Sequence, residues 1–232
     1  MSCARALPFV LLLSACAAQS GSNASPEVIA NSVADVIADL SGVGAAPATM
    51  PTSGGATYSG YATAFVKETI TDQIGRQLVG TAALDATFTA AGARIDGSVG
   101  NMLGKTGVNQ TELFSAIQNG HAGDIEDILA DYSEATGQIA VESTGASGAN
   151  FEVTIDGTIT HEGDALHFDG RGTGNFSGDG ATGVQVTGTA GLWGFCIWAT
   201  SEMPEAQKLG SASIPGTPRA AMLFWAASPN TP

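Results

Sequence analysis

Histidine and carboxylate side chains gather in one short stretch, at His161, Glu162, Asp164 and His167. Two imidazoles and a carboxylate are donors that zinc accepts. Residues 161–167 span a predicted turn between two strands, and successive side chains of a strand point to opposite faces. His161 falls on the apolar phase and His167 on the polar phase, so the two imidazoles are expected to point apart. Chance proximity is therefore a simpler interpretation than a metal site.

A second acid-rich segment contains Asp124, Glu126 and Asp127, with Asp131 nearby. Carboxylate oxygens are the ligands that calcium prefers. The segment lacks the alternating Asp/Asn–Gly loop of a calcium-binding hand, and such a run is also typical of a solvated helix face. We expect the solvated face.

His121 lies in a glycine-flanked segment, and Tyr132 follows it by eleven positions. Both residue types ligate haem iron in proteins. His121, with Tyr132, is therefore the candidate haem site of this chain. Apart from this hypothesis the sequence predicts no cofactor and no metal.

Catalytic signatures are missing from the sequence. It contains no Gly-x-Ser-x-Gly elbow, no phosphate-binding loop and no His-Glu-x-x-His motif. No nucleophile, base and orienting group converge along the chain, so an enzyme is not expected. A polar pocket with a paired histidine and carboxylate would reopen that possibility.

The N-terminus has the pattern of an export signal. Arg5 precedes an apolar run from Leu7 to Leu13, and small residues lead to Cys16. The ending Leu13-Ser14-Ala15-Cys16 resembles a bacterial lipobox, which implies that Cys16 is acylated and becomes the first mature residue. An ordinary cleaved signal is the alternative. Residues 1–15 are thus expected to be a lipoprotein signal peptide, and the run is too short to span a bilayer.

The overall charge restricts the class of partner. The chain has a formal net charge of −14 at pH 7. Such a surface repels phosphate backbones, so nucleic acid is not an expected partner. A basic protein or a divalent cation suits it better.

Residues 16–56 are predicted to form a lipidated tether, a short helix and a linker. Ser25-Pro26-Glu27 combines a capping hydroxyl, a proline at the first helical position and an acid in the first turn. Apolar residues then recur at three- and four-residue spacing until Gly42, which can end the helix. Its polar face lacks basic residues, so we expect it to pack on the protein rather than on a membrane.

From residue 57 the apolar period changes to two. The eight strand candidates cover residues 57–66, 76–88, 93–99, 138–143, 151–161, 165–176, 183–192 and 220–226. Asp-Gly normally marks a hairpin turn, but Asp96-Gly97, Asp156-Gly157 and Asp169-Gly170 lie in phase with unbroken alternation, with glycine on the apolar face. Glycine there lets a strand bend sharply.

Long, bent, one-side-apolar strands close most naturally on themselves. We therefore predict an all-β fold: an eight-stranded antiparallel soluble β-barrel over 57–232, preceded by the short helix and interrupted by insertions near 100–137 and 199–218. An open sandwich is the alternative. The apolar face should point inward, since the opposite faces carry threonine and acids rather than the lipid-facing band of a membrane barrel.

Near the end of the seventh strand candidate, Trp193, Phe195 and Trp198 surround Cys196. If exposed, the aromatic rings would form a binding patch; if buried, they would plug one barrel end. With Cys3 in the signal and Cys16 acylated, Cys196 has no disulfide partner. It is either a reactive thiol or a small buried hydrophobe.

Several segments resemble the β-barrel domain of the transferrin-binding protein B family of surface lipoproteins. They are Tyr58-Ser-Gly-Tyr61, residues 93–101, Gly137-Gln-Ile-Ala140, residues 174–178 and Val186-Thr-Gly-Thr189, and the resemblance covers roughly residues 57–227. It implies display of a binding surface to a protein or to an iron or haem carrier. Transferrin receptors of that family have two lobes with handle domains, and no handle is evident here.

These features together predict a lipid-anchored binding protein of a Gram-negative outer membrane, facing the cell exterior. The lipid on Cys16 would be its membrane contact, and a protein or an iron or haem carrier its partner. The alternative is a structural envelope lipoprotein without a soluble ligand.

Overall fold

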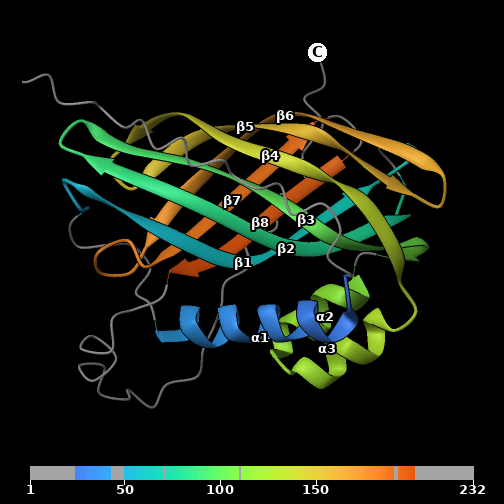
Figure 1. Ribbon diagram of the computed structural model, residues 1–232. Helices are drawn as coiled ribbons and strands as arrows, with labels where there is room; N and C mark the ends of the chain where they lie inside the picture. Colours follow the sequence, from blue (N-terminus) through green and yellow to red (C-terminus); the bar gives the residue numbers. More distant parts are fainter. Residues whose placement is uncertain (1–23, 43–49, 70–71, 110, 191–192, 202–232) are drawn as a thin grey trace, which may run out of the picture.

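The computed structural model describes residues 24–42, 50–69, 72–109, 111–190 and 193–201 of this 232-residue chain. These ranges form three helices and eight strands (Figure 1). In chain order they are α1 (Pro26–Gly42), β1 (Gly54–Val66), β2 (Ile74–Thr89), β3 (Gly92–Asn109), α2 (Thr111–Asn119), α3 (Ala122–Leu129), β4 (Ser133–Ser147), β5 (Asn150–His161), β6 (Asp164–Ser177), β7 (Gly183–Ala190) and β8 (Trp193–Ser201).

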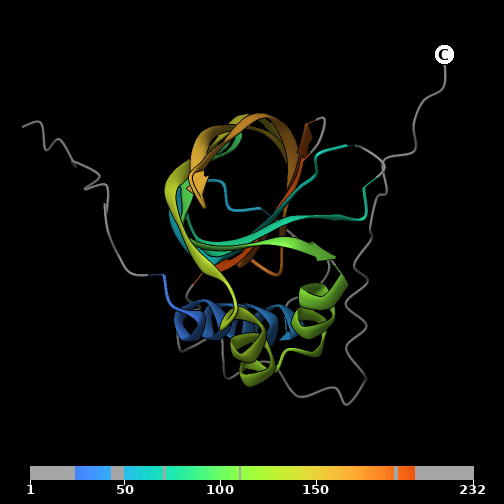
Figure 2. The same cartoon turned by 90° about the vertical axis from the view of Figure 1, so that its right-hand side faces the viewer.

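The eight strands form one closed antiparallel barrel. Each strand pairs with the next in the sequence, and β8 pairs with both β7 and β1. Along the closing seam the register runs from Tyr58 opposite Ser201 to Val66 opposite Trp193. Figure 2 shows the ring of strands end-on. The predicted eight-stranded antiparallel barrel is therefore confirmed, and its closure pairs the first strand with the last.

The Asp-Gly pairs lie within strands, as the alternation predicts. They are Asp96-Gly97 in β3, Asp156-Gly157 in β5 and Asp169-Gly170 in β6. A Cβ atom at Gly157 would lie 2.3 Å from the carbonyl oxygen of Gln138 and 2.7 Å from the Cα of Ile139. Only glycine allows the neighbouring strand to approach so closely, which permits the tight curl of the sheet.

Apolar side chains fill the barrel interior. One cluster of buried residues contains side chains from all eight strands, among them Leu84, Val99, Ile155 and Ile197. Phe168 stands edge-on to the ring of Trp193, with 5.2 Å between the ring centroids. The interior is thus a packed core.

Four aromatic residues close one end of this core. The ring centroid of Phe176 lies 5.0 Å from that of Phe151, 5.6 Å from that of Phe88 and 6.1 Å from that of Tyr58. The buried Tyr58 hydroxyl donates a hydrogen bond of 2.5 Å to the carbonyl of Ala181. A buried phenol needs such a partner. The opposite end, where β2, β4 and β6 begin, includes the polar side chains of Arg76, Ser133 and Asp164.

The helices pack together on one outer side of the barrel (Figures 1 and 2). The expected cap of α1 is present, because the Ser25 hydroxyl accepts a hydrogen bond from the Val28 backbone N–H at 3.2 Å. Buried residues of α1 include Ile29 and Val33. They join an outer cluster with Tyr61, Val79 and Leu103 of β1–β3 and with apolar residues of α2 and α3. The prediction that α1 packs on the protein is confirmed.

Two hydrogen bonds fix α1 to the barrel wall. The Ser32 hydroxyl donates to the carbonyl of Gly60 in β1 at 3.0 Å. The Thr200 hydroxyl of β8 donates to the carboxylate of Asp39 at 2.9 Å. Helix and barrel are therefore joined by specific polar contacts as well as by apolar burial.

The expected boundaries change in three places. Strand β3 continues to Asn109 through a bulge near Asn101, so the insertion predicted at 100–137 covers only residues 110–132. The strand that closes the ring is Trp193–Ser201 rather than 220–226, and 220–226 lies outside the described residues. Residues 199–201 belong to β8 rather than to the insertion predicted at 199–218, and the rest of that range lies outside the described residues.

Candidate functional site

His161 is the buried imidazole of the barrel's polar end. It is the last residue of β5, faces inward and is 1% exposed. Its Nε2 lies 2.8 Å from the Oγ of Ser133. Ser133 is the first residue of β4, and it is exposed. A Cβ atom at Gly104 would lie 2.7 Å from Nε2 and 2.8 Å from a methyl group of Leu78. The glycine thus provides the space that the ring occupies.

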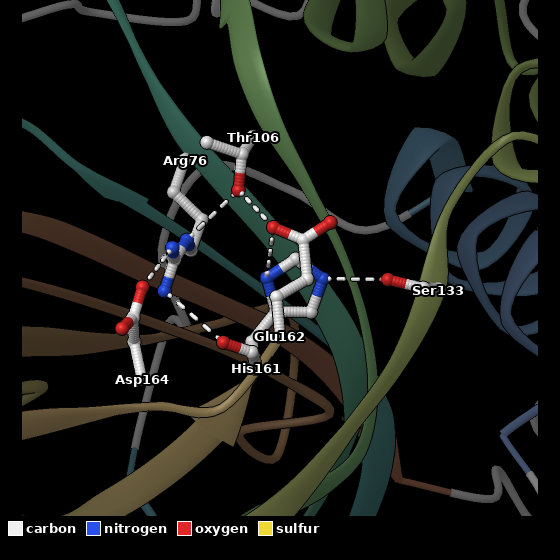
Figure 3. A network of polar contacts seen from close by, with 6 residues as sticks. All are labelled: Arg76, Thr106, Ser133, His161, Glu162 and Asp164. Atoms are coloured by element: carbon white, nitrogen blue, oxygen red, sulfur yellow. Dashed lines mark hydrogen bonds and ion pairs between the residues drawn. The ribbon is translucent and has the colours of Figure 1, made fainter.

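A chain of polar contacts surrounds this imidazole (Figure 3). The Arg76 guanidinium donates to the Thr106 hydroxyl at 3.0 Å, to the His161 carbonyl at 3.4 Å and to the Asp164 carboxylate at 2.7 Å. The Thr106 hydroxyl in turn donates to Oε2 of Glu162 at 2.8 Å. Arg76 is largely buried, at 12% side-chain exposure, and therefore holds the β5–β6 turn against β2 and β3.

Glu162 occupies a backbone conformation that glutamate rarely adopts. Its φ is 55°, and Gly163 follows with a φ of 86°, which together form the two-residue turn between β5 and β6. Asparagine, aspartate and glycine are the residues that accept this region easily. The Glu162 side chain folds back so that Oε2 lies 3.8 Å from Nδ1 of His161. That nitrogen is buried and makes no hydrogen bond among the described residues.

The two histidines of the metal hypothesis do not converge. His167 is exposed on the outer face of β6, where its Nδ1 lies 3.0 Å from the Thr158 hydroxyl, whereas His161 points into the barrel. This confirms that the two imidazoles point apart. Within the described residues no three His, Cys, Asp or Glu side chains are placed to hold a metal.

The acid-rich segment forms a solvated helix face, as expected. Asp124, Glu126 and Asp127 are exposed on α3. The carboxylate of Asp131 pairs with Lys105 at 3.4 Å and is 78% exposed.

The haem candidates flank helix α3. His121 is the exposed residue that precedes the helix, and its side chain makes no cap hydrogen bond. Tyr132 follows the helix, packs on the outer cluster and has the Nζ of Lys105 5.8 Å from its ring centroid. Burial raises the pKa of the Tyr132 hydroxyl to about 12, so the phenol is neutral at physiological pH. The haem hypothesis stays a prediction.

The aromatic residues near Cys196 divide between the two faces of β8. Phe195 is buried in the barrel core, and the partly buried Trp193 packs against the same core. Trp198 faces outward and stacks on Tyr61, with 5.2 Å between the ring centroids. Cys196 is half-buried, and burial raises the pKa of its thiol to about 11. The thiol is therefore protonated and weakly nucleophilic at neutral pH.

Sequence reasoning missed an acidic face on the outer wall of the barrel, formed by β2–β6. The register places Asp85 opposite Asp96, Asp96 opposite Glu142, and Asp156 opposite Asp169. Like charges directly opposite each other on neighbouring strands destabilise a sheet. Arg94 offsets part of this repulsion through its 2.7 Å ion pair with Asp96.

The sequence indicates only part of this acidic face and of the polar contacts around His161. Alternation places Asp156 and Asp169 on the polar face, but only the strand register brings acids of different strands together. Ser133 and Thr106 lie in the segment that was expected to be an insertion. Their contacts with the β5–β6 turn could not be predicted from spacing.

Cys16 and the rest of the predicted signal lie outside the described residues. None of the helices in the described ranges is long and apolar enough to cross a membrane.

No protein-family model matches the chain, and no curated protein does. Among solved structures the chain is similar to the vaccine antigen transferrin-binding protein B of Haemophilus parasuis Hp5, a double mutant. The two share 15% identity, with a TM-score of 0.38, over 67% of this chain and 27% of that one. This chain forms an eight-stranded antiparallel β-barrel. It spans only 27% of the length of that solved structure.

Proposed function

We propose that this chain is a lipid-anchored surface lipoprotein whose barrel binds a basic protein partner on its outer acidic face. Signal-like residues 1–15 followed by Cys16 support the anchor. The filled interior supports binding on the outside, because side chains from all eight strands occupy the space that a ligand inside the barrel would need.

The acidic face is the observation that carries the binding proposal. Asp85, Asp96 and Glu142 form an unbroken row across three neighbouring strands, and Asp85 and Glu142 are exposed. A partner with clustered lysine or arginine would relieve the repulsion within this row. Complementary charge also speeds encounter and selects partners. The face lies on the barrel wall, and α1 leaves it accessible, because Asp85 and Glu142 are both exposed.

A charge-matched pair of variants tests this proposal. The first combines Asp85→Asn, Asp96→Asn and Glu142→Gln, and the second combines the equivalent changes at Asp124, Glu126 and Asp127 on α3. Both remove three negative charges. The probe is a fluorescent decalysine peptide, measured by anisotropy at low and at physiological salt.

We expect the barrel variant to weaken decalysine binding about tenfold at low salt, and the helix variant to weaken it less than about threefold. Equal weakening by the two variants would show that only net charge matters. The acidic face would then not be a binding surface.

The resemblance of the strand segments to transferrin-binding protein B suggests iron or haem carriers as one class of partner. Purified transferrin and haemoglobin are the defined probes for that class, with the same two variants as controls. Saturable binding that the barrel variant loses supports it. The absence of saturable binding to both probes counts against it.

The anchor and its location have their own tests. Cys16→Ser should abolish incorporation of labelled palmitate, whereas Cys196→Ser should leave it unchanged. Protease treatment of intact cells should cleave a surface-exposed chain. Protection from protease would favour the alternative, a structural lipoprotein that packs inside the envelope.

A further inference from the structure

The polar end of the barrel contains a serine, a histidine and a carboxylate in the order of contacts that activates a nucleophile. The exposed Ser133 Oγ lies 2.8 Å from Nε2 of His161, and the other ring nitrogen, Nδ1, lies 3.8 Å from Oε2 of Glu162. In hydrolases with such a triad, the imidazole takes the serine proton and the acid orients the imidazole. We propose that Ser133 is a nucleophile toward small carboxylic esters, with His161 as its base and Glu162 as a positioning residue.

The tautomer that this chemistry needs is favoured by the surroundings of the ring. A negative carboxylate beside Nδ1 stabilises a proton on that nitrogen. Nε2 is then free to accept the hydrogen bond of the Ser133 hydroxyl. The ring is 1% exposed, and it lies so close to Gly104 that a Cβ atom there would come within 2.7 Å of Nε2, so the imidazole has little room to turn away from Ser133.

Glu162 is held in place at a conformational cost. Its φ of 55° suits asparagine or glycine better, yet its carboxylate accepts a hydrogen bond from Thr106, which Arg76 positions. Backbone strain of this kind is concentrated at functional sites.

The proposed hydrolysis needs only the ester and water. The Ser133 Oγ attacks the ester carbonyl carbon as its proton moves to Nε2 of His161. The tetrahedral adduct breaks its bond to the alcohol, which leaves with that proton, and an acyl-serine remains. Water then attacks the acyl carbon as one of its protons moves to Nε2. The bond between the acyl carbon and Oγ breaks, Nε2 returns that proton to Oγ, and the carboxylic acid leaves with Ser133 and His161 restored.

A fluorophosphonate probe tests the nucleophile directly, because Oγ attack on phosphorus expels fluoride and leaves a stable adduct. We expect the purified full-length chain to be labelled at Ser133, as located by peptide mass spectrometry. Ser133→Ala should abolish this adduct. Ser115→Ala, which changes an exposed serine on α2 without a histidine partner, should leave it unchanged.

The histidine and the glutamate have separate readouts. His161→Gln should slow labelling by about 100-fold, the lower end of the range for a general base. Labelling of the unchanged protein at Ser133 does not require any variant to fold.

Glu162→Asn separates chemistry from structure. Asparagine relieves the strained φ, so the thermal midpoint should stay equal or rise, while loss of the carboxylate should slow labelling about tenfold. Labelling at wild-type rate would overturn the role assigned to Glu162. A wild-type protein that takes up no probe at Ser133 would overturn the nucleophile itself.

Discussion

A methyl group at Gly157 should disrupt the close strand approach that allows the barrel to close. The Cβ of Gly157→Ala would lie 2.3 Å from the Gln138 carbonyl oxygen, 2.7 Å from the Ile139 Cα and 3.1 Å from the Gln138 carbonyl carbon. All three are backbone atoms of β4, so no side chain can rotate away. Relief requires the two strands to separate and their hydrogen bonds to lengthen.

The change in the free energy of unfolding on Gly157→Ala is the balance of stabilising and destabilising contributions. A buried methyl group stabilises by about 0.8 kcal/mol, and the loss of glycine flexibility in the unfolded chain adds about 0.4–1 kcal/mol. Overpacking in a dense core costs about 1–3 kcal/mol or more, and contact with rigid backbone favours the upper end. We expect a net destabilisation of about 1–2 kcal/mol.

Urea unfolding followed by circular dichroism measures this loss, and Gly194→Ala is the matched control. Gly194 also lies within a strand, but a Cβ there would meet no atom within 4 Å. Its free energy of unfolding should change by less than about 0.5 kcal/mol. If Gly157→Ala is as stable as the control at an equal m-value, close approach at glycine is not what holds the barrel together.

Three further outcomes follow from the packing. Tyr58→Phe leaves the buried carbonyl of Ala181 without its donor and should cost about 1–3 kcal/mol in thermal unfolding. Ile29→Ala, at a fully buried position of α1, should lower the free energy of unfolding by about 2–5 kcal/mol. Val28→Ala, at a 53% exposed position of the same helix, should lower it by less than about 0.5 kcal/mol. Equal losses in the two variants would contradict the docking of α1 on the barrel. Because burial raises the thiol pKa of Cys196 to about 11, iodoacetamide should alkylate Cys196 much more slowly than glutathione at pH 8. The alkylation rate of Cys196 should then rise steadily up to pH 10. A rate that levels off near pH 8 would contradict this effect of burial.

The triad hypothesis shows why tertiary contacts decide chemistry. His161 was assigned correctly to the apolar phase of its strand, and a buried imidazole on that phase needs a polar partner. The partner is Ser133, 28 residues earlier, and nothing in the local sequence of either residue indicates the other. Arg76 and Thr106 come from two more strands.

Local sequence patterns predict which face of each element points inward. Period-two alternation separated inward from outward side chains, in-phase Asp-Gly pairs predicted mid-strand bends, and Ser25 with Gly42 predicted the limits of α1. These features depend on residues close in the chain, where side-chain direction follows from backbone geometry alone.

Which elements become neighbours depends on the folded barrel as a whole. It selected Trp193–Ser201 as the closing strand, aligned Asp85 with Asp96 and Glu142, and placed α1 against the outer face of β1. Alternation fixes the face of each residue but not its partner on the next strand. That partner depends on bulges, turn lengths and the energy of the whole packed core.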